Sequence, residues 1–198
     1  MLAAVILSGG ASQRMGSPKA LLPYQGRPFL EHLLEVTTHA KIGARRVVLG
    51  AHADLIAEAV RLADDEVVIN AEWEKGQLSS IHAGIRSLPA GTDGMILCLI
   101  DHPLISASLV DELIGRFYAE QAARPLIVLP VYQGKRGHPV IFSAGVYVEL
   151  LAAPLDQGAR SVVWAHAEEI AEVITAEQGC VLNLNDQETV KRVLGGTI

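Results

Sequence analysis

The hydrophobic positions of this chain fall into short continuous runs that alternate with longer amphipathic stretches. The short runs are rich in Val, Ile and Leu, and they predict strands at residues 3–7, 46–49, 66–69, 95–100 and 126–129. The longer stretches have helical spacing and predict helices at residues 28–40, 53–63, 78–88 and 106–119. Parallel strands need crossovers of helical length. The alternation therefore predicts a Rossmann-like three-layer α/β/α fold with a mainly parallel central sheet.

The pattern changes after Pro130. A loop rich in Gly, Lys and Arg at residues 133–138 precedes a strand-like run at 139–142, and helix-like pieces follow near 147–152 and 159–167. We expect a final strand at 180–184 and a short helix from about Gln187. No internal repeat or linker interrupts the chain, so residues 1–198 are expected to form one domain with a different second half.

Composition narrows the class of protein. Half of the residues are hydrophobic and 19% are charged, which excludes a disordered chain, and the low aromatic content leaves Ala, Val, Ile and Leu to build the core. The net charge of −6 argues against a nucleic-acid partner, and no apolar run approaches the ~20 residues of a membrane span. Cys98 and Cys180 lie in apolar runs and are interpreted as buried strand residues rather than disulfide or metal ligands. A cytoplasmic protein is expected.

A glycine-rich loop at residues 7–19, LSGGASQRMGSPK, directly follows the first predicted strand. Gly9 and Gly10 allow close approach of a ligand to the backbone, Ser12 adds a hydroxyl, and Arg14 and Lys19 add positive charge. Many donors and local cations in one loop favour a nucleoside triphosphate as ligand. The spacing is neither G-x-G-x-x-G nor a Walker A sequence, and a glycine-rich turn with solvated charges is the alternative.

Together with ALLP at 20–23 and GRPFLEH at 26–32, this loop resembles the MobA-like nucleotidyltransferases. That family includes enzymes that attach CMP or GMP to molybdopterin. The resemblance covers most of the chain and implies a nucleotide-diphospho-sugar transferase-like fold. It also implies that the loop binds the triphosphate, with Arg14 and Lys19 as catalytic residues. The nucleotide-binding residues expected here are Leu7, Ser8, Gly9, Gly10, Ser12, Arg14 and Lys19.

A carboxylate follows the strand predicted at 95–100, in the sequence Asp101-His102-Pro103. Magnesium prefers oxygen ligands, so Asp101 is a candidate metal ligand, although an Asp in this position also often opens a turn. The family has Asp-x-Pro at this point, and the resemblance implies a catalytic, Mg²⁺-binding role. Near the C-terminus Asn183 and Asn185 stand where the family often has carboxylates. They are further metal-ligand candidates that would bring no charge, and the neighbouring Asp186 is expected to cap the last helix.

Two further segments are candidates for the base and the acceptor. In residues 70–80, Gly76 allows a tight approach, while Ser79 and Ser80 either cap the following helix or bind a nucleobase. The family resemblance favours the base, and Trp73 is interpreted as a packing residue. In residues 134–139, Lys135, Arg136 and His138 offer three potential cations, so the loop is either a basic turn facing water or a site for a phosphorylated acceptor. The resemblance favours acceptor binding by Arg136 and His138.

We therefore expect a Mg²⁺-dependent nucleotidyltransferase that moves CMP, or alternatively GMP, from its triphosphate to a phosphorylated acceptor such as molybdopterin. About residues 1–130 would bind nucleotide and metal, and about 131–198 would bind the acceptor. A sugar-1-phosphate nucleotidyltransferase is one alternative. A non-catalytic nucleotide-binding partner of a molybdoenzyme maturation factor is a second, and a glycosyltransferase that binds a nucleotide-sugar is a third.

Overall fold

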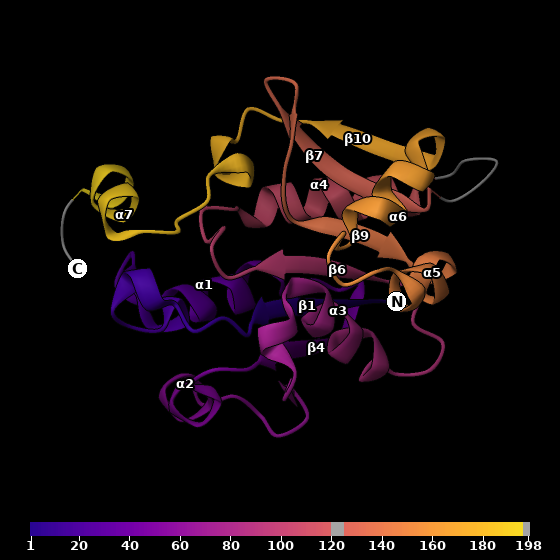
Figure 1. Cartoon of the computed structure of the whole chain (residues 1–198). Helices are drawn as coiled ribbons and strands as arrows, with labels where there is room; N and C mark the ends of the chain where they lie inside the picture. Colours follow the sequence, from indigo (N-terminus) through magenta and orange to yellow (C-terminus); the bar gives the residue numbers. More distant parts are fainter. Residues whose placement is uncertain (120–124, 196–198) are drawn as a thin grey trace.

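The structure is a computed structural model that describes residues 1–119 and 125–195. Its main strands are β1 (Leu2–Ser8), β4 (Ile42–Leu49), β5 (Val67–Ile69), β6 (Gly94–Leu99), β7 (Ile127–Tyr132), β8 (Lys135–Arg136), β9 (Val140–Ser143) and β10 (Ile170–Ile174). In the described residues they form one sheet in the order β10-β7-β9-β6-β1-β4-β5, with β8 paired to β7 (Figure 1). Among the described strands of this sheet, β8 and β9 run opposite to the others, which are parallel to one another, so the sheet is mainly parallel, as expected. A separate ribbon pairs β2 (Pro23–Tyr24) with β3 (Arg27–Pro28).

Helices cover both faces of this sheet. They are α1 (Phe29–Val36), α2 (Ala53–Val60), α3 (Gln77–Arg86), α4 (Ala107–Tyr118), α5 (Tyr147–Ala152), α6 (Arg160–Ala165) and α7 (Gln187–Leu194). Apolar side chains of α1, α2 and α4 form one core cluster with the sheet, and those of α3, α5 and α6 form a second. The three-layer α/β/α arrangement is thereby confirmed. The last helix, α7, instead packs through Val190 against the loop and ribbon that follow β1.

The central strand β1 explains why the first loop occupies a fixed place. All seven of its residues are buried, with Ala4 and Ile6 in one core cluster and Val5 and Leu7 in the other. A parallel strand covered on both faces requires such a continuous apolar run. The glycine loop leaves its carboxyl end, and Asp101 follows the carboxyl end of the neighbouring β6. Both therefore lie at the edge of the sheet where ligands bind in open α/β folds.

The elements expected between residues 3 and 119 are present, with shifted ends. The strand β4 begins at Ile42, earlier than residue 46, and α1 ends at Val36 rather than 40. Ser106 caps α4, because its Oγ accepts a hydrogen bond from the backbone N–H of Leu109 at 3.1 Å. Asp186 caps α7 in the same way, accepting from the N–H of Thr189 at 2.8 Å, which confirms that expectation.

The prediction of a final strand at residues 180–184 is wrong. Residues Gln178–Val181 form a short 3-10 helix, and the edge strand lies earlier, at β10. The apolar residues of this segment contact the loop after β6 instead of adding a strand to the sheet. The Leu184 N–H donates to the carbonyl of Asp101 at 2.8 Å, and a Cβ on Gly179 would lie 2.0 Å from the carbonyl oxygen of Leu104. Cys180 is buried as expected but does not lie in a strand.

Cys98 lies on β6, and both cysteines are free and buried, which confirms the expected burial. Burial raises the pKa of the Cys98 thiol to about 12, which makes it a poor nucleophile. None of the helices in residues 1–119 and 125–195 combines the length and apolar character needed to cross a bilayer.

Candidate active site

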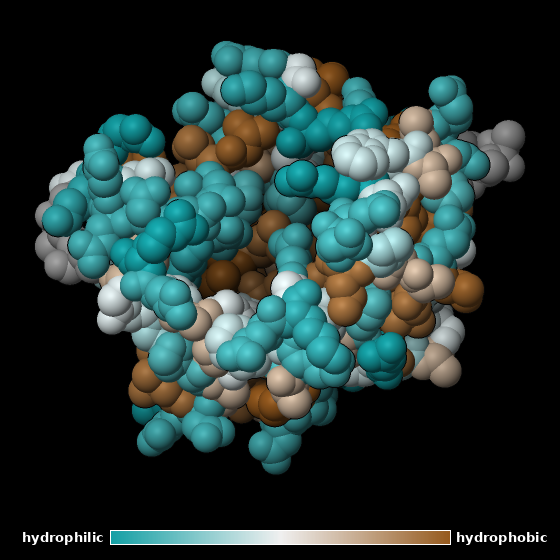
Figure 2. Space-filling model, in the orientation of Figure 1, coloured by the Kyte–Doolittle hydropathy of each residue, from teal (hydrophilic) through white to brown (hydrophobic). Residues whose placement is uncertain are grey.

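A cleft of about 640 Å³ opens where β1 and β6 end. Figure 2 shows it as a hollow in the middle of the visible face, with a hydrophobic floor and a hydrophilic rim. Sequence segments that are far apart meet in it. The expected site residues that line it are Leu7, Ser8, Gly9, Gly10, Ser12, Arg14, Lys19, Gly76, Ser80, Asp101 and Asn185.

The glycine loop is folded around Ser12. This residue has a left-handed backbone conformation (φ 50°), and its Oγ accepts a hydrogen bond from the backbone N–H of Lys19 at 3.1 Å. Since the hydroxyl oxygen is used as an acceptor here, its hydrogen remains available to donate to a ligand. The side chain of Gln187 in α7 also donates to the carbonyl of Met15 at 3.0 Å. The C-terminal helix thus helps to hold the loop in place.

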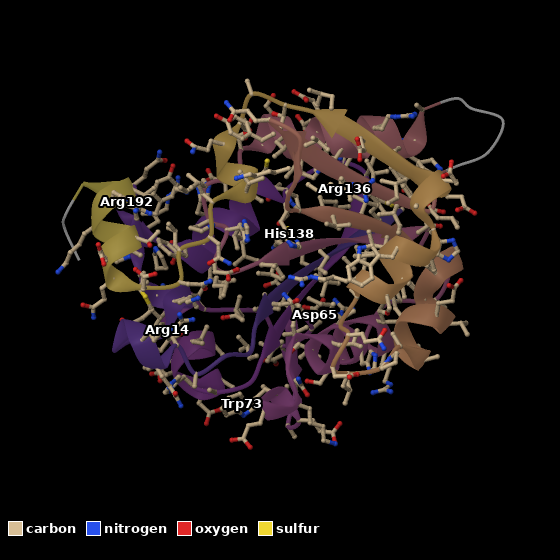
Figure 3. All side chains as sticks on the ribbon, turned by 45° about the horizontal axis from the view of Figure 1, so that its top comes forward. Arg14, Asp65, Trp73, Arg136, His138 and Arg192 are labelled. Atoms are coloured by element: carbon tan, nitrogen blue, oxygen red, sulfur yellow. The ribbon has the colours of Figure 1, made fainter. Side chains whose placement is uncertain are left out.

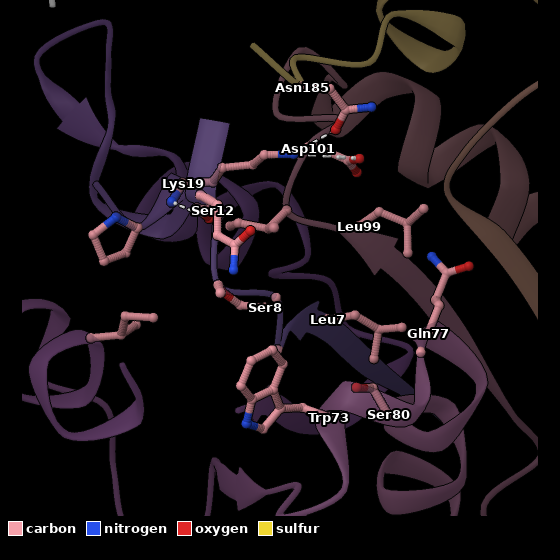
Figure 4. Close-up of a pocket in the computed structure, with 18 of the residues that line it drawn as sticks. Leu7, Ser8, Ser12, Lys19, Trp73, Gln77, Ser80, Leu99, Asp101 and Asn185 are labelled. Carbon is pink, nitrogen blue, oxygen red and sulfur yellow. Dashed lines mark hydrogen bonds and ion pairs between the residues drawn. The ribbon is translucent and has the colours of Figure 1, made fainter. Parts of the chain in front are cut away.

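One end of the cleft is charged (Figure 4). There the Lys19 ammonium donates to Oδ1 of Asn185 at 2.5 Å and lies 3.9 Å from Oδ2 of Asp101. Burial lowers the pKa of Lys19 below its ordinary value; the Asp101 carboxylate opposes this shift, and the Arg14 guanidinium adds to it. A ligand phosphate at this end would supply the negative charge that favours the ammonium form.

The two asparagines expected near the metal have different positions. Asn185 lines the cleft beside Asp101, whereas Asn183 is exposed and is not among the lining residues. In the described part of the chain, no three His, Cys, Asp or Glu side chains form a group that could hold a metal. One carboxylate and one amide oxygen nevertheless fit Mg²⁺, which is commonly held by one or two protein oxygens, substrate phosphates and water.

The two serines of α3 also have different surroundings. Ser79 is enclosed by its own loop, since the carbonyls of Gly76 (2.7 Å) and Glu72 (2.9 Å) share its one hydroxyl hydrogen. Ser80 lines the cleft and accepts a hydrogen bond from Nδ2 of Asn70 at 3.0 Å, so its hydroxyl hydrogen can be donated to a ligand. Neither hydroxyl caps α3. The structure therefore brings Ser80, but not Ser79, to the cleft surface.

Sequence reasoning did not identify Asn70 or the cleft-lining role of Trp73. Asn70 is buried and donates from Nδ2 to both serine hydroxyls, at 2.9 Å to Ser79 and 3.0 Å to Ser80. Trp73 does pack, as expected, but it also lines the cleft. The available signal was the position of Asn70 directly after a strand, at the start of a turn-rich segment.

The hairpin with Arg136 and His138 does not line the main cleft. Arg136 donates from Nε to Glu172 of the neighbouring β10 at 2.8 Å, and Figure 3 shows it towards that edge of the sheet. His138 lies nearer the middle, with its ring centroid 5.0 Å from that of His102. Burial, followed by the neighbouring His102, lowers the pKa of His138 to about 3. His138 is therefore neutral at pH 7 and does not act as a third cation of this loop.

Two curated relatives are similar to this chain. It is 35% identical to the nicotine blue oxidoreductase of Paenarthrobacter nicotinovorans over 149 residues, 72% of this chain and 71% of that protein. It is 28% identical to a probable molybdenum cofactor guanylyltransferase of Bacillus cereus (strain AH820). This match extends over 193 residues, 94% of this chain and 92% of the relative.

A solved structure and a family model agree with this similarity. The manganese complex of Rv0371C from Mycobacterium tuberculosis H37Rv superposes with a TM-score of 0.76 at 25% identity and covers 99% of both chains. Residues 4–170 match the model of the MobA-like NTP transferase domain. The chain belongs to the MobA-like nucleotidyltransferase family.

Proposed function

We propose that this protein transfers a nucleoside monophosphate from a nucleoside triphosphate to a phosphorylated small molecule and releases pyrophosphate. The observation that supports this most directly is the charged end of the cleft, where the glycine loop, Lys19 and Asp101 meet. Cations and exposed backbone N–H groups bind a triphosphate, and a carboxylate beside them suits a divalent ion bound to the same phosphates.

In this mechanism the chain acts by alignment and charge neutralisation. Arg14 and Lys19 hold the triphosphate, and Ser12 donates its free hydroxyl hydrogen to a phosphate oxygen. An oxygen of the acceptor phosphate forms a bond to the α-phosphorus, and the bond from that phosphorus to the bridging oxygen of pyrophosphate breaks. The nucleophile is already ionised near neutral pH, so the reaction needs no strong general base.

Asp101 and Asn185 are the residues that would hold Mg²⁺. A divalent ion supplies charge neutralisation and orientation at phosphate oxygens. The manganese bound in the related mycobacterial structure supports a divalent metal in this family. Lys19 contacts Asn185 and lies beside Asp101, so the same side chains would orient the ammonium towards the phosphates.

CTP is the donor we favour, and GTP is the alternative. The segment from Gly76 to Ser80 resembles the cytidylyl-transferring branch, and Ser80 can donate a hydrogen bond to an oxygen or ring nitrogen of a base. The similarity to a probable guanylyltransferase supports GTP. Thermal unfolding with each of the four triphosphates, with and without Mg²⁺, would separate these donors. A ligand at ~100 times its Kd adds about 2.7 kcal/mol of stability.

The acceptor we propose is a phosphorylated molecule such as molybdopterin, supported by the names of the guanylyltransferase relatives. Residues up to about 130 would bind nucleotide and metal, and residues from about 131 the acceptor; residues 196–198 of that second part lie outside the described range. Arg136 and His138 are the proposed acceptor contacts, with neutral His138 acting as a hydrogen-bond partner. Acceptor binding there would require Arg136 to exchange its bond to Glu172 for one to phosphate.

The decisive experiment is pyrophosphate release with CTP or GTP and Mg²⁺, in the presence of molybdopterin or a sugar 1-phosphate. Pyrophosphate release with molybdopterin as acceptor, but not with the sugar 1-phosphate, supports the proposal. Release only with the sugar phosphate would instead identify a sugar-1-phosphate nucleotidyltransferase. Nucleotide binding without release under any acceptor would indicate a binding partner of molybdoenzyme maturation, and the proposed transfer would be rejected.

The 35% identity to a nicotine blue oxidoreductase favours one second candidate, a redox reaction on an aromatic dye. A nicotinamide dinucleotide would be the hydride donor, with its pyrophosphate bound by the same glycine loop. The test is to mix the protein with NADH or NADPH and a quinoid dye and to follow oxidation of the nicotinamide by absorbance. Dye-dependent oxidation that is lost in Lys19→Ala, together with no pyrophosphate release, would favour this function over nucleotidyl transfer.

A further inference from the structure

We propose that the indole of Trp73 is the surface on which the nucleobase stacks. This inference rests on the proposed function, because it assigns the base-binding end of the same cleft. Trp73 belongs to a short 3-10 helix, Trp73–Lys75, between β5 and α3. It lines the cleft and is partly buried, so one part of its surface packs against the protein while another part is open to a ligand.

The charges at the two ends of the cleft are complementary to those at the two ends of a nucleoside triphosphate. Figure 4 shows Lys19, Asp101 and Asn185 at one end and Trp73 at the other, with Ser8 between them. At the Trp73 end the lining includes Glu74, an acidic residue. A carboxylate repels a triphosphate, whereas an aromatic ring attracts the flat face of a base. The charges therefore direct the triphosphate to Lys19 and the base to Trp73.

A missing side chain at Gly50 makes room for the indole. A Cβ on Gly50 would lie 2.5 Å from Cβ of Trp73 and 2.6 Å from its Cγ, closer than two non-bonded carbons can approach. The same atom would lie 2.5 Å from the carbonyl oxygen of Gly9, which accepts a hydrogen bond from the N–H of Ala51 at 3.0 Å. The indole thus rests on the backbone at the end of β4, directly beside the glycine loop.

The buried side chain of Asn70 fixes the loop that contains Trp73. Asn70 Oδ1 accepts from the N–H of Glu72 at 3.0 Å, and Asn70 Nδ2 donates to the hydroxyls of Ser79 and Ser80. Ser79 in turn donates to the carbonyl of Glu72. These bonds hold the residue before Trp73 and the start of α3 together. An aromatic side chain held in this way loses little freedom when a flat ligand stacks on it.

The chain contains only two tryptophans, which allows a direct test. In Trp164→Phe, Trp73 is the only source of tryptophan fluorescence, and in Trp73→Phe the only source is Trp164, which is 68% exposed on α6. The probes are CTP and GTP with Mg²⁺, and inorganic tripolyphosphate, which has the charge but no base. Binding of each probe is measured separately by calorimetry.

We expect saturating nucleotide to change the fluorescence of Trp164→Phe, tripolyphosphate to leave it unchanged, and Trp73→Phe to give no nucleotide response. Trp73→Ala should weaken nucleotide binding by about 10- to 100-fold, while tripolyphosphate binds with unchanged affinity. A purely structural role of Trp73 would weaken both ligands together.

The failure of this inference differs from the failure of the proposed function. If calorimetry shows nucleotide binding to Trp164→Phe but its fluorescence does not respond, the stacking role is wrong while nucleotide binding stands. If no triphosphate binds the parent chain at all, both are rejected. The fluorescence test uses the native Trp73 side chain, so it remains decisive even if Trp73→Ala does not fold.

Discussion

The main cleft and the hairpin at residues 133–138 contain similar residue types but have different surroundings. In the cleft, Lys19 and Asp101 follow buried strands and lie 3.9 Å apart, facing open volume. In the hairpin, Arg136 is bonded to Glu172, and His138 is half-buried with its ring centroid 5.0 Å from that of His102. Polar residues at the carboxyl ends of parallel strands share one edge of the sheet, whereas hairpin residues take positions set by whatever packs against the turn.

The difference also appears in charge. At the cleft end with Lys19, burial lowers the pKa of the ammonium while a carboxylate beside it opposes the shift, so the site is completed by a charged ligand. At the hairpin, burial leaves His138 neutral. A strongly charged ligand should therefore affect the first region more than the second, and four predictions test this comparison.

The largest expected effect is at the charged end of the cleft. Asp101→Asn should lower nucleotidyl transfer by about 100- to 1,000-fold, because it removes the only carboxylate at that end among the described lining residues. Lys19→Ala should weaken triphosphate binding by about 10- to 100-fold, since hydrogen bonds to charged groups contribute about 1.5–3 kcal/mol. Pyrophosphate release and calorimetry measure the two effects.

Lys41→Ala is the matched control for these variants. Lys41 is an exposed lysine that lies 5.4 Å from the ring centroid of Tyr118, outside the cleft lining. It should bind nucleotide as the parent chain does. Full activity of Asp101→Asn, with folding verified by thermal unfolding, would contradict the metal-binding assignment.

The next effect concerns the contact between the hairpin and the C-terminal segment. A Cβ on Gly137 would lie 2.5 Å from the carbonyl oxygen of Cys180 and 2.8 Å from its carbonyl carbon. Gly137→Ala should therefore destabilise the fold by about 1–3 kcal/mol, as expected for overpacking at a tight contact. The same substitution at Gly115 in α4, where nothing lies within 4 Å, should stabilise by about 0.5–1 kcal/mol. Denaturant unfolding compares the two variants. If Gly137→Ala is as stable as the parent chain, the contact between the hairpin and Cys180 is looser than described.

The burial of His138 predicts a pH dependence of stability. Its pKa is about 3 in the folded chain and near its ordinary value of 6.5 when unfolded, so only the unfolded chain takes up a proton between these values. Stability should fall as the pH falls from 6.5 to 3, by about 2 kcal/mol at pH 5, since one pKa unit corresponds to about 1.36 kcal/mol.

His138→Gln isolates this contribution. The fall in unfolding free energy from pH 7 to pH 5 should be about 2 kcal/mol smaller in the variant than in the parent chain. The pKa of His102 is also lowered, first by burial, so a residual dependence is expected in the variant. If the pH dependence of the two proteins is the same, His138 is not buried in the way described.

The first half of the molecule could be predicted from its sequence, because its local patterns agree with its tertiary contacts. The buried strands β1 and β6 are continuous apolar runs, and each is followed within two residues by one suited to a ligand, Gly9 or Asp101. Residues 180–184 offer a similar apolar pattern, yet their backbone bonds to the loop after β6. Nothing local to Trp73 indicates that Gly50, much earlier in the chain, leaves space for its indole. These contacts exist only once the chain is folded.

The smallest expected effect on stability is that of Arg136→Gln. The Arg136–Glu172 pair is exposed, with side chains 43% and 40% accessible, so its loss should cost less than about 1 kcal/mol. If Arg136 binds the phosphate of the acceptor, the variant should raise the KM for acceptor several-fold and leave the Kd for nucleotide unchanged. Steady-state kinetics with the acceptor varied at saturating nucleotide measure this.

Glu172→Gln distinguishes an acceptor contact from a merely structural pair. It removes the same ion pair but frees the guanidinium, so its effect on stability should match that of Arg136→Gln. Its effect on the acceptor should be opposite, because Arg136 no longer has to exchange a carboxylate for phosphate, and the KM should stay the same or fall. A rise of KM in both variants would mean that the pair acts through the shape of the hairpin. The acceptor would then bind elsewhere. The main cleft and the hairpin would differ in structure, but the hairpin would have no separate role in binding the acceptor.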